Sequence, residues 1–253
     1  GHAEAGGLAD AVGGAAAAIA EVCRRLDGIP LAIELAAARA KVLSVEQIAD
    51  KLDDRFALLA GGNRTAPKRQ QTLRAAIDWS HDLLSDSERG LFRRLAVFAG
   101  GFSLAAVEAV AGGDVLDPLT RLVETSLVVA ESRDDGSVRY RTFETVREYA
   151  AERLREAGEE SDVRRRHRDW FLQLAEDAEP KLTGPDQVAW IARLEDEHDN
   201  LAAALRWSVD HAGDWESGLR LCYALGRFWS VRAHLSEGRA WIERVLSMTP
   251  DPR

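Results

Sequence analysis

The side chains that could ligate a metal ion are scattered along this sequence. It holds six histidines and two cysteines, residue types that often bind zinc. The densest group of candidate ligands, EDEHD at residues 195–199, contains His198, but a zinc-protease helix needs two histidines one turn apart. The other histidines that we considered are His81, His167, His211 and His234, and no two form a pair at metal-binding spacing. We therefore predict no metal site and interpret residues 195–199 as the solvated face of a helix.

A glycine-rich segment, GGNRTAPKR at residues 61–69, has part of the composition of a phosphate-binding loop. Such a loop follows a strand and places a glycine directly before its lysine. Here Ala66 stands where the second glycine is required, Pro67 precedes Lys68, and no predicted strand leads into the segment. No acidic residue follows an apolar strand to hold magnesium either. We interpret the segment as a linker and expect this chain, taken alone, not to be an enzyme.

The composition is that of a globular, largely helical protein. Of its 253 residues, 46% are hydrophobic and 30% are charged, and the formal net charge is −9. This acidic balance argues against a surface covered by nucleic acid, although it is compatible with a local basic face. No apolar run reaches the roughly 18 residues of a membrane span. We interpret Cys23 and Cys222 as buried thiols of a cytoplasmic protein, and we expect the sequence to be part of a longer chain.

Gly28 and Pro30 interrupt a region near the start that is otherwise helical. Residues 15–26 and 31–40 both have helical patterns, and glycine and proline punctuate helices. Proline lacks an N–H and suits the first turn of the second helix, whereas glycine can take the positive φ that ends the first. The sequence therefore predicts two helices that meet at a corner.

Capping residues predict the helices that follow. Ser44 and Ser85 are each followed three positions later by Gln or Glu, as in a capping box, and Ser103 and Asp117 are suited to cap two further helices. The expected helices are 44–56, 70–84, 86–98, 103–110 and 117–125.

The hydrophobic period then changes to that of short strands. Residues 127–130 and 138–140 lie on either side of Asp134-Asp135-Gly136, which is a hairpin turn sequence. Three helices followed by a two-stranded hairpin have the arrangement of a winged helix, in which the hairpin is the wing. Residues 143–157 return to a helical pattern.

The last third of the sequence predicts paired helices. The expected helices are 162–179, 185–211, 215–232 and 236–247. From Leu225 the chain reads LGRFWSVRAHLSEGRAWIERVLSMTP, which resembles a tetratricopeptide repeat, with small Gly238 where two helices approach closely. We therefore predict a mainly α protein in three parts: a helical domain remnant over 1–62, a winged-helix domain over 63–158, and the start of a tetratricopeptide-like arm of antiparallel α-hairpins over 159–253.

Four landmarks in this order resemble one family. Gly28-Ile29-Pro30-Leu31-Ala32 resembles the G-L-P-L-A motif of NB-ARC-type STAND ATPases, and residues 69–101 resemble the start of the winged helix in large actinobacterial regulators of that class, of the LuxR or SARP type. Residues 140–154 and 194–208 resemble the next landmarks. The chain thus resembles the C-terminal part of an NB-ARC-type module followed by a helical arm.

The resemblance implies a nucleotide contact in the intact protein. In the family, the proline at the helix corner packs against adenine, so Pro30 would line the base pocket, with Gly28, Ile29 and Leu31 supporting it; the alternative is that this corner only turns the chain. ATP or ADP is therefore expected in the intact parent and no cofactor in this chain alone. Thr142-Phe143-Glu144 stands where the family often has a Met-His-Asp-like triplet, and phenylalanine cannot donate a hydrogen bond to phosphate. Arg141, Arg69 or Arg74 could supply charge instead, although exposed arginines are more often solvated surface.

The implied function is regulatory and non-catalytic: a nucleotide switch coupled to recognition of a signal, with a protein or peptide partner on the helical repeats. Trp229 and Trp241 are candidate partner-binding residues, although packing between helices is the favoured explanation of their spacing. The alternative function is DNA binding by the winged helix. The helix from Leu116 carries one arginine and two acids, and the wing mixes arginines with Asp134 and Asp135. We therefore expect nucleic acid not to bind this part, whereas other domains of the intact parent could bind it. We also expect no membrane partner.

Overall fold

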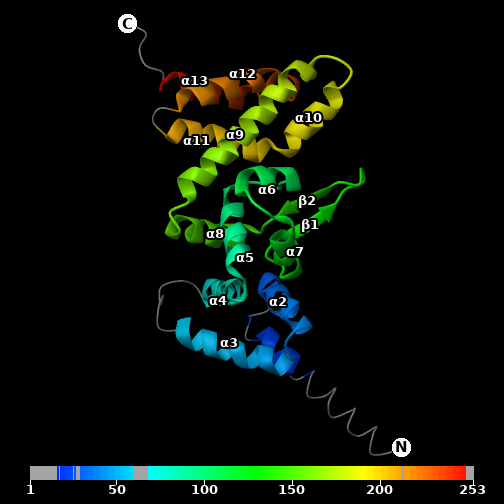
Figure 1. Cartoon of the computed structure of the whole chain (residues 1–253), viewed down its shortest axis with the longest axis vertical. Coiled ribbons are helices and arrows are strands. Elements are labelled where there is room, and N and C mark those ends of the chain that lie inside the picture. Colours follow the sequence, from blue (N-terminus) through cyan, green and yellow to red (C-terminus); the bar gives the residue numbers. More distant parts are fainter. Residues whose placement is uncertain are drawn as a thin grey trace, which may run out of the picture. The chain divides into compact units, whose positions relative to one another are not determined.

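The computed structural model describes residue 16 and residues 18–24, 26, 29–59, 68–211 and 214–248. The described chain is mainly helical with one two-stranded antiparallel hairpin, β1–β2, as predicted (Figure 1). It divides into two compact units. The first comprises the described residues up to Gly90 together with Leu116–Val129 and Phe143–Tyr149, and the second comprises the remainder. None of the helices described is long and apolar enough to cross a membrane.

The first unit is built on helix α4. Its elements are α2 (Pro30–Ala37), η1 (Ala38–Lys41), α3 (Val45–Leu59), α4 (Lys68–Asp82), the first part of α5 (Asp86–Arg94), α7 (Leu116–Glu124) and the start of α8 (Glu144–Glu156). Helices α2 and α3 both pack on α4, and Leu35, Leu52 and Ala75 are fully buried in this unit. The apolar faces of these amphipathic helices thus form one small core.

Pro30 begins helix α2, as predicted. Ile29 is the N-cap in an extended conformation, and proline lies in the first turn, where its missing N–H costs nothing. The helix predicted over 31–40 continues from α2 into the 3-10 turn η1. Gly28 and most of the linker at residues 61–69 lie outside the described residues.

The three serine caps are confirmed. The Oγ atoms of Ser44, Ser85 and Ser103 each accept a hydrogen bond from the backbone N–H three residues on, at 3.3, 3.4 and 3.3 Å. The side chains of Gln47 and Glu88 complete the two capping boxes by accepting the serine N–H at 3.0 and 2.8 Å. Helix α5 passes into the 3-10 turn η2 (Leu95–Val97), and α6 spans Leu104–Ala111.

Several predicted boundaries differ from the structure by one to four residues, and for two of them the local structure shows how. Helix α7 begins at Leu116, so Asp117 lies in its first turn instead of capping it. The first strand is Val129–Ser132 and not 127–130, because the N–H groups of Leu127 and Val128 donate to the carbonyl of Leu122 and so complete the end of α7. The second strand, β2, is Val138–Arg141.

The turn of the hairpin follows the predicted sequence. Gly136 has φ of 80°, a backbone conformation that residues other than glycine rarely adopt. The Asp135 carboxylate accepts the Ser137 N–H at 2.9 Å. At the base of the hairpin, Phe102 and Tyr140 exchange two backbone hydrogen bonds of 2.8 Å.

The second unit contains the helical arm. Its helices are α9 (Glu160–Ala178), α10 (Gln187–Asp196), α11 (His198–Asp210), α12 (Trp215–Val231) and α13 (Leu235–Leu246), with the 3-10 turn η3 (Glu179–Leu182) after α9. Helix α9 packs against α6, α11 and α12. The prediction of a single helix over 185–211 is wrong, because the helix is interrupted at Glu197 and forms α10 and α11 instead. The cause of that break lies in the contacts of Glu197 described below.

Helices α12 and α13 approach closely at Gly238. A Cβ atom at that position would lie 2.5 Å from Cε3 of Trp229, far inside van der Waals contact. The small residue that the repeat pattern picked out is therefore required by the packing of the indole ring. Gly226 in α12 is the opposite case, since a Cβ there would meet no atom within 4 Å.

We expect Gly238→Ala to lower the free energy of unfolding by about 1 kcal/mol, because overpacking costs about 1–3 kcal/mol and the better helix propensity of alanine returns less than about 1. The matched change Gly226→Ala should raise stability by up to about 1 kcal/mol. Urea denaturation of both variants measures the difference. Equal effects of the two substitutions would contradict the close packing.

An aromatic cluster surrounds a buried histidine in the second unit. The His167 ring lies 5.3 Å from that of Phe98 and 4.6 Å from that of Phe171, centroid to centroid, and the residue is 3% exposed. Burial lowers the pKa of His167 from 6.5 to about 3. The imidazole is therefore neutral in the folded protein at any pH well above 3.

Acidification should therefore weaken the fold through His167. Between pH 6.5 and about 3 the unfolded chain binds a proton that the folded chain excludes, so this part of the stability is complete above pH 6.5 and falls by about 1.4 kcal/mol per pH unit below it. Urea melts at pH 7 and pH 5 should differ by about 2 kcal/mol less in His167→Gln than in the parent chain. His211→Gln, which changes an exposed histidine, should keep the parental difference, and the same slope in all three proteins would refute the assignment.

Candidate functional site: the joint between the wing and the helical arm

The residues expected near a nucleotide keep their predicted local structure. Pro30 is exposed at the start of α2, and Ile29 and Leu31 are partly exposed. Their contact with adenine stays a prediction, as does any role of Gly28, which lies outside the described residues. Of the arginines considered as a source of charge, Arg74 lies over the ring of Tyr149, and the Arg141 guanidinium pairs with the Glu131 carboxylate at 2.5 Å.

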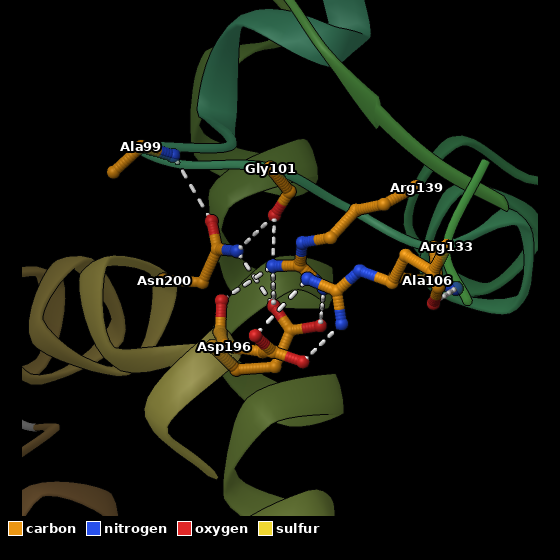
Figure 2. Close-up of polar contacts among 9 residues, drawn as sticks. Ala99, Gly101, Ala106, Arg133, Arg139, Asp196 and Asn200 are labelled. Carbon is orange, nitrogen blue, oxygen red and sulfur yellow. Dashed lines mark hydrogen bonds and ion pairs between the residues drawn. The ribbon is translucent and has the colours of Figure 1, made fainter. Parts of the chain in front are cut away.

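The remaining arginines of the wing contact the arm. Arg133, just beyond β1, forms a two-pronged pair with the Asp196 carboxylate at the end of α10, one contact being Nη2 to Oδ1 at 3.0 Å. Figure 2 shows Arg133 and Arg139 reaching from the hairpin toward Asp196 and Asn200 of the arm. All of these residues belong to the second unit. Two wing arginines are thus engaged by acids of the same unit.

Arg139 makes the more buried of these contacts. Its Nη1 and Nη2 atoms donate to the two carboxylate oxygens of Glu197 at 2.6 and 3.0 Å. Nη2 also donates to the backbone carbonyls of Gly101 and Asp196, at 2.7 and 2.5 Å. The side chains of Arg139 and Glu197 are only 14% and 8% exposed. A buried ion pair of this kind is stable only when its remaining hydrogen-bonding atoms are also satisfied, and the two carbonyls meet that condition.

Asn200 extends the network to the segment before α6. Its Oδ1 accepts the N–H of Ala99 at 3.0 Å, and its Nδ2 donates to the Gly101 carbonyl and to Glu197, both at 2.8 Å (Figure 2). The amide is completely buried, yet it makes three hydrogen bonds. The neutral amide of Asn200 thus joins the backbone of residues 99–101 to the Glu197 carboxylate.

Glycine is required beside this network. A Cβ on Gly101 would lie 2.7 Å from Nε of Arg139 and 3.2 Å from the Tyr140 carbonyl oxygen. The pair Gly100-Gly101 follows a helix in the sequence, but the absence of a side chain at Gly101 also leaves room for the Arg139 guanidinium to reach the backbone. We call Arg133, Arg139, Asp196, Glu197 and Asn200, with the backbone of residues 99–101, the joint.

The joint explains why the helix predicted over 185–211 is broken. Glu197 lies between α10 and α11 with φ of −101° and ψ of 8°, outside helical values. The Asp196 carbonyl accepts from Arg139, so the contact with the hairpin replaces part of the helical bonding at this point. The sequence EDEHDN contains no glycine or proline, so no local pattern could have revealed the break.

In the more exposed pair of the joint, Arg133 and Asp196, each residue stabilises the charged form of the other. The hydrogen bond from Arg133 holds the pKa of the Asp196 carboxyl below its usual range, and the hydrogen bond to Asp196 raises the pKa of Arg133. A carboxylate with a lowered pKa contributes stability above its ordinary pKa and loses it as the pH falls through the lowered value. The pair therefore persists at mildly acidic pH.

Helix α7, which would occupy a DNA groove in a winged helix, has few free positive groups. Its sequence, LDPLTRLVE, contains two acids and one arginine. Arg121 pairs with Glu124 at 3.0 Å, and Asp117 and Thr120 are exposed. This face offers little attraction to a phosphate backbone.

The structure also brings together residues that the sequence left apart. His198, His234 and Glu237, which come from the starts of α11 and α13, lie close enough to share an ion. The two histidines lie close together only because the chain folds, and their spacing in the sequence does not indicate this proximity. Trp229 and Trp241, the predicted partner-binding residues, are 3% and 8% exposed, which favours the packing role, and partner binding by them stays a prediction.

Comparison with known proteins identifies the middle of the chain. Residues 84–155 match the winged helix-turn-helix domain, so the predicted winged helix is confirmed. Over 237 residues the chain is 54% identical to "Putative HTH-type transcriptional regulator Rv0890c" of Mycobacterium tuberculosis, and equally to a protein of the same description, Mb0914c, of Mycobacterium bovis. It is also 48% identical over 165 residues to "Uncharacterized protein Rv0894" of Mycobacterium tuberculosis.

These relatives are longer than the chain. The first two matches cover 91% of this chain and 26% of the relative, and the third covers 62% and 42%. The chain thus spans about a quarter of the length of the regulators it resembles. No solved structure matches it. The chain contains a winged helix-turn-helix domain and is homologous to part of mycobacterial proteins described as transcriptional regulators.

The buried pair of the joint should contribute more than an exposed pair on the same hairpin. We expect Glu197→Gln to lower the free energy of unfolding by about 3 kcal/mol, because it leaves the Arg139 charge buried without its counter-ion. Glu131→Gln removes the exposed partner of Arg141, whose side chains are 43% and 53% exposed, and should cost less than about 1 kcal/mol. Chemical denaturation of the two variants measures both values, and a cost below about 1 kcal/mol for Glu197→Gln would contradict a stabilising joint.

Proposed function

We propose that this chain is a regulatory, non-catalytic part of a transcriptional regulator, in which the winged helix relays a signal from the helical arm. In the intact protein the signal would be coupled to a nucleotide switch of the STAND type, with ATP or ADP held beside Pro30, Ile29 and Leu31. The resemblance to NB-ARC-type proteins supports the nucleotide part. The winged helix-turn-helix match and the printed descriptions of the relatives support the regulatory part.

The observation that carries the proposal is the engagement of the wing by the arm. The wing arginines Arg133 and Arg139 are already paired with Asp196 and Glu197, so their charges are not available to phosphate in this arrangement. A wing held in this way transmits a displacement of α10 and α11 to the hairpin, because packed and ion-paired elements move as discrete bodies. The arm would then receive a protein or peptide partner, since helical repeats present concave surfaces.

The second candidate function is direct DNA binding by the winged helix. The match of residues 84–155 to the winged helix-turn-helix domain favours it, because that motif commonly places its second helix of the pair in the major groove. The relatives named as HTH-type regulators favour it as well. The two functions differ in what the isolated chain should do with DNA.

Binding of a fluorescent mixed-sequence duplex to the chain, measured by anisotropy at several salt concentrations, separates the two. The relay proposal predicts a Kd no tighter than the non-specific range of about 10⁻⁴–10⁻⁶ M at physiological salt. Tighter binding that weakens steeply with salt, and that Arg121→Ala on α7 abolishes while Arg244→Ala on α13 does not, would contradict the relay and establish DNA binding by the winged helix.

A further inference from the structure

Two histidines and a glutamate gather where α11 and α13 begin. His198 is the first residue of α11, His234 is the N-cap of α13, and Glu237 lies in the first turn of α13. One possible ligand atom from each lies within 4.8 Å of those of the other two. His198 Nε2 is 3.0 Å from Glu237 Oε2, and the two imidazole rings stack with centroids 5.0 Å apart. Two imidazoles and a carboxylate are a common ligand set for zinc.

One ring nitrogen of these two histidines is buried without a hydrogen bond. Nε2 of His234 is inaccessible to solvent and has no hydrogen-bond partner among the described residues. The nearest charged group, Oε1 of Glu195, is 3.7 Å away, which is too far for a hydrogen bond. Leaving a buried polar atom unsatisfied costs free energy. A cation beside this nitrogen would remove that cost and would also attract Glu195.

The neighbouring side chains orient these possible ligands. The Trp241 indole Nε1 donates to Glu237 Oε1 at 3.3 Å, which leaves Oε2 directed to His198. Glu195 is oriented by Arg232, whose Nε donates to Oε2 at 2.7 Å, so its Oε1 stays on the side of His234. The Phe228 ring packs against both imidazoles, with centroids 6.3 and 5.9 Å away. Oriented carboxylates and an apolar wall are what tune a metal site.

We propose that His198, His234 and Glu237 bind a divalent transition-metal ion of the zinc class, with Glu195 or water in the fourth position. The nitrogen ligands suit zinc, cobalt and nickel and disfavour magnesium and calcium, which take oxygen ligands. In a tetrahedral site with bonds of about 2.0–2.1 Å, ligand atoms lie about 3.3 Å apart, so the group contracts by roughly 1.5 Å or less through side-chain rotation.

Such an ion would join two helix starts next to the joint. His198 follows Glu197 directly in sequence, and Glu197 holds Arg139. Binding that favours one arrangement of α11 relative to α13 therefore also biases the position of the acid that engages the wing. A bound metal ion could therefore regulate the arm through Glu197, the residue that pairs with Arg139 in the proposed relay. Metal binding itself does not require the relay.

Titration of the chelator-treated chain tests the proposal. Isothermal calorimetry with Zn²⁺ should give one equivalent of binding with a micromolar or tighter Kd, and Co²⁺ should give the intense visible absorption of tetrahedral nitrogen and oxygen ligation. Mg²⁺ should show neither. Failure of the parent chain to bind Zn²⁺ more tightly than about 1 mM would overturn the proposal, whatever the DNA-binding result.

Variants locate the ion. The double change His198→Ala and His234→Ala should weaken Zn²⁺ binding more than about 100-fold, which exceeds the cost of losing a residue that only orients a ligand. His211→Ala, at the other end of α11, should bind as the parent does. His2 is present in every variant, so any binding there would survive in the double variant and would count against the site.

Two subtler changes keep the test meaningful if the double variant does not fold. Glu237→Gln preserves shape and the hydrogen bond from Trp241 but removes the charge, and should weaken Zn²⁺ binding at least 10-fold. Trp241→Phe keeps an aromatic ring but removes the indole donor, and should weaken binding by about 10–100-fold. Circular dichroism confirms that each variant is folded, and unchanged affinity in both folded variants would refute these roles.

Discussion

The buried ion pair between Arg139 and Glu197 is the interaction on which the second unit depends. Removing two charges from water costs several kcal/mol for each ion, so the pair is stable only because its surroundings complete it. The carbonyls of Gly101 and Asp196 and the amide of Asn200 supply those hydrogen bonds. These contacts hold together strand β2, the break between α10 and α11, and the glycine segment at residues 99–101.

In the proposed relay, this interaction would give the winged helix a different role from that of a domain that reads DNA directly. In a wing that reads DNA, arginines would be free to meet phosphate, whereas Arg133 and Arg139 face carboxylates of the arm. The homology to transcriptional regulators and the charge arrangement are compatible if the domain transmits a signal inside a longer protein. Metal binding at His198 and His234 would act next to the same break between α10 and α11, because His198 directly follows Glu197.

Local sequence rules accounted for most of the secondary structure. Serine caps, Pro30 and the Asp-Asp-Gly turn each have a physical cause within a few residues, and each lies where it was predicted. Gly238 was also predictable, because a small residue opposite an indole follows from helix pairing. The first strand was displaced because Leu127 and Val128 bond back to α7, which no propensity distinguishes from strand pairing.

The candidate site was hidden for a different reason. The joint unites residues about 60 and 100 positions apart, and the acids at 195–199 have the composition of an ordinary solvated helix face. The same holds for His198 and His234, whose proximity arises only when α11 and α13 pack. Charge and spacing in one sequence cannot identify such partners. In the structure, the helix over this region is interrupted at Glu197 although no glycine or proline is present, which indicates that a tertiary contact determines the local geometry.

A double-mutant cycle on Arg139→Met and Glu197→Gln tests the central claim most directly. The free energies of unfolding of the parent, both single variants and the double variant give the coupling energy of the pair without the effects that each substitution has by itself. A wing held by this ion pair predicts a coupling of about 1–3 kcal/mol, with the double variant more stable than the sum of the single effects allows. Additivity within about 0.5 kcal/mol would show that the wing does not depend on the arm, and would contradict the account.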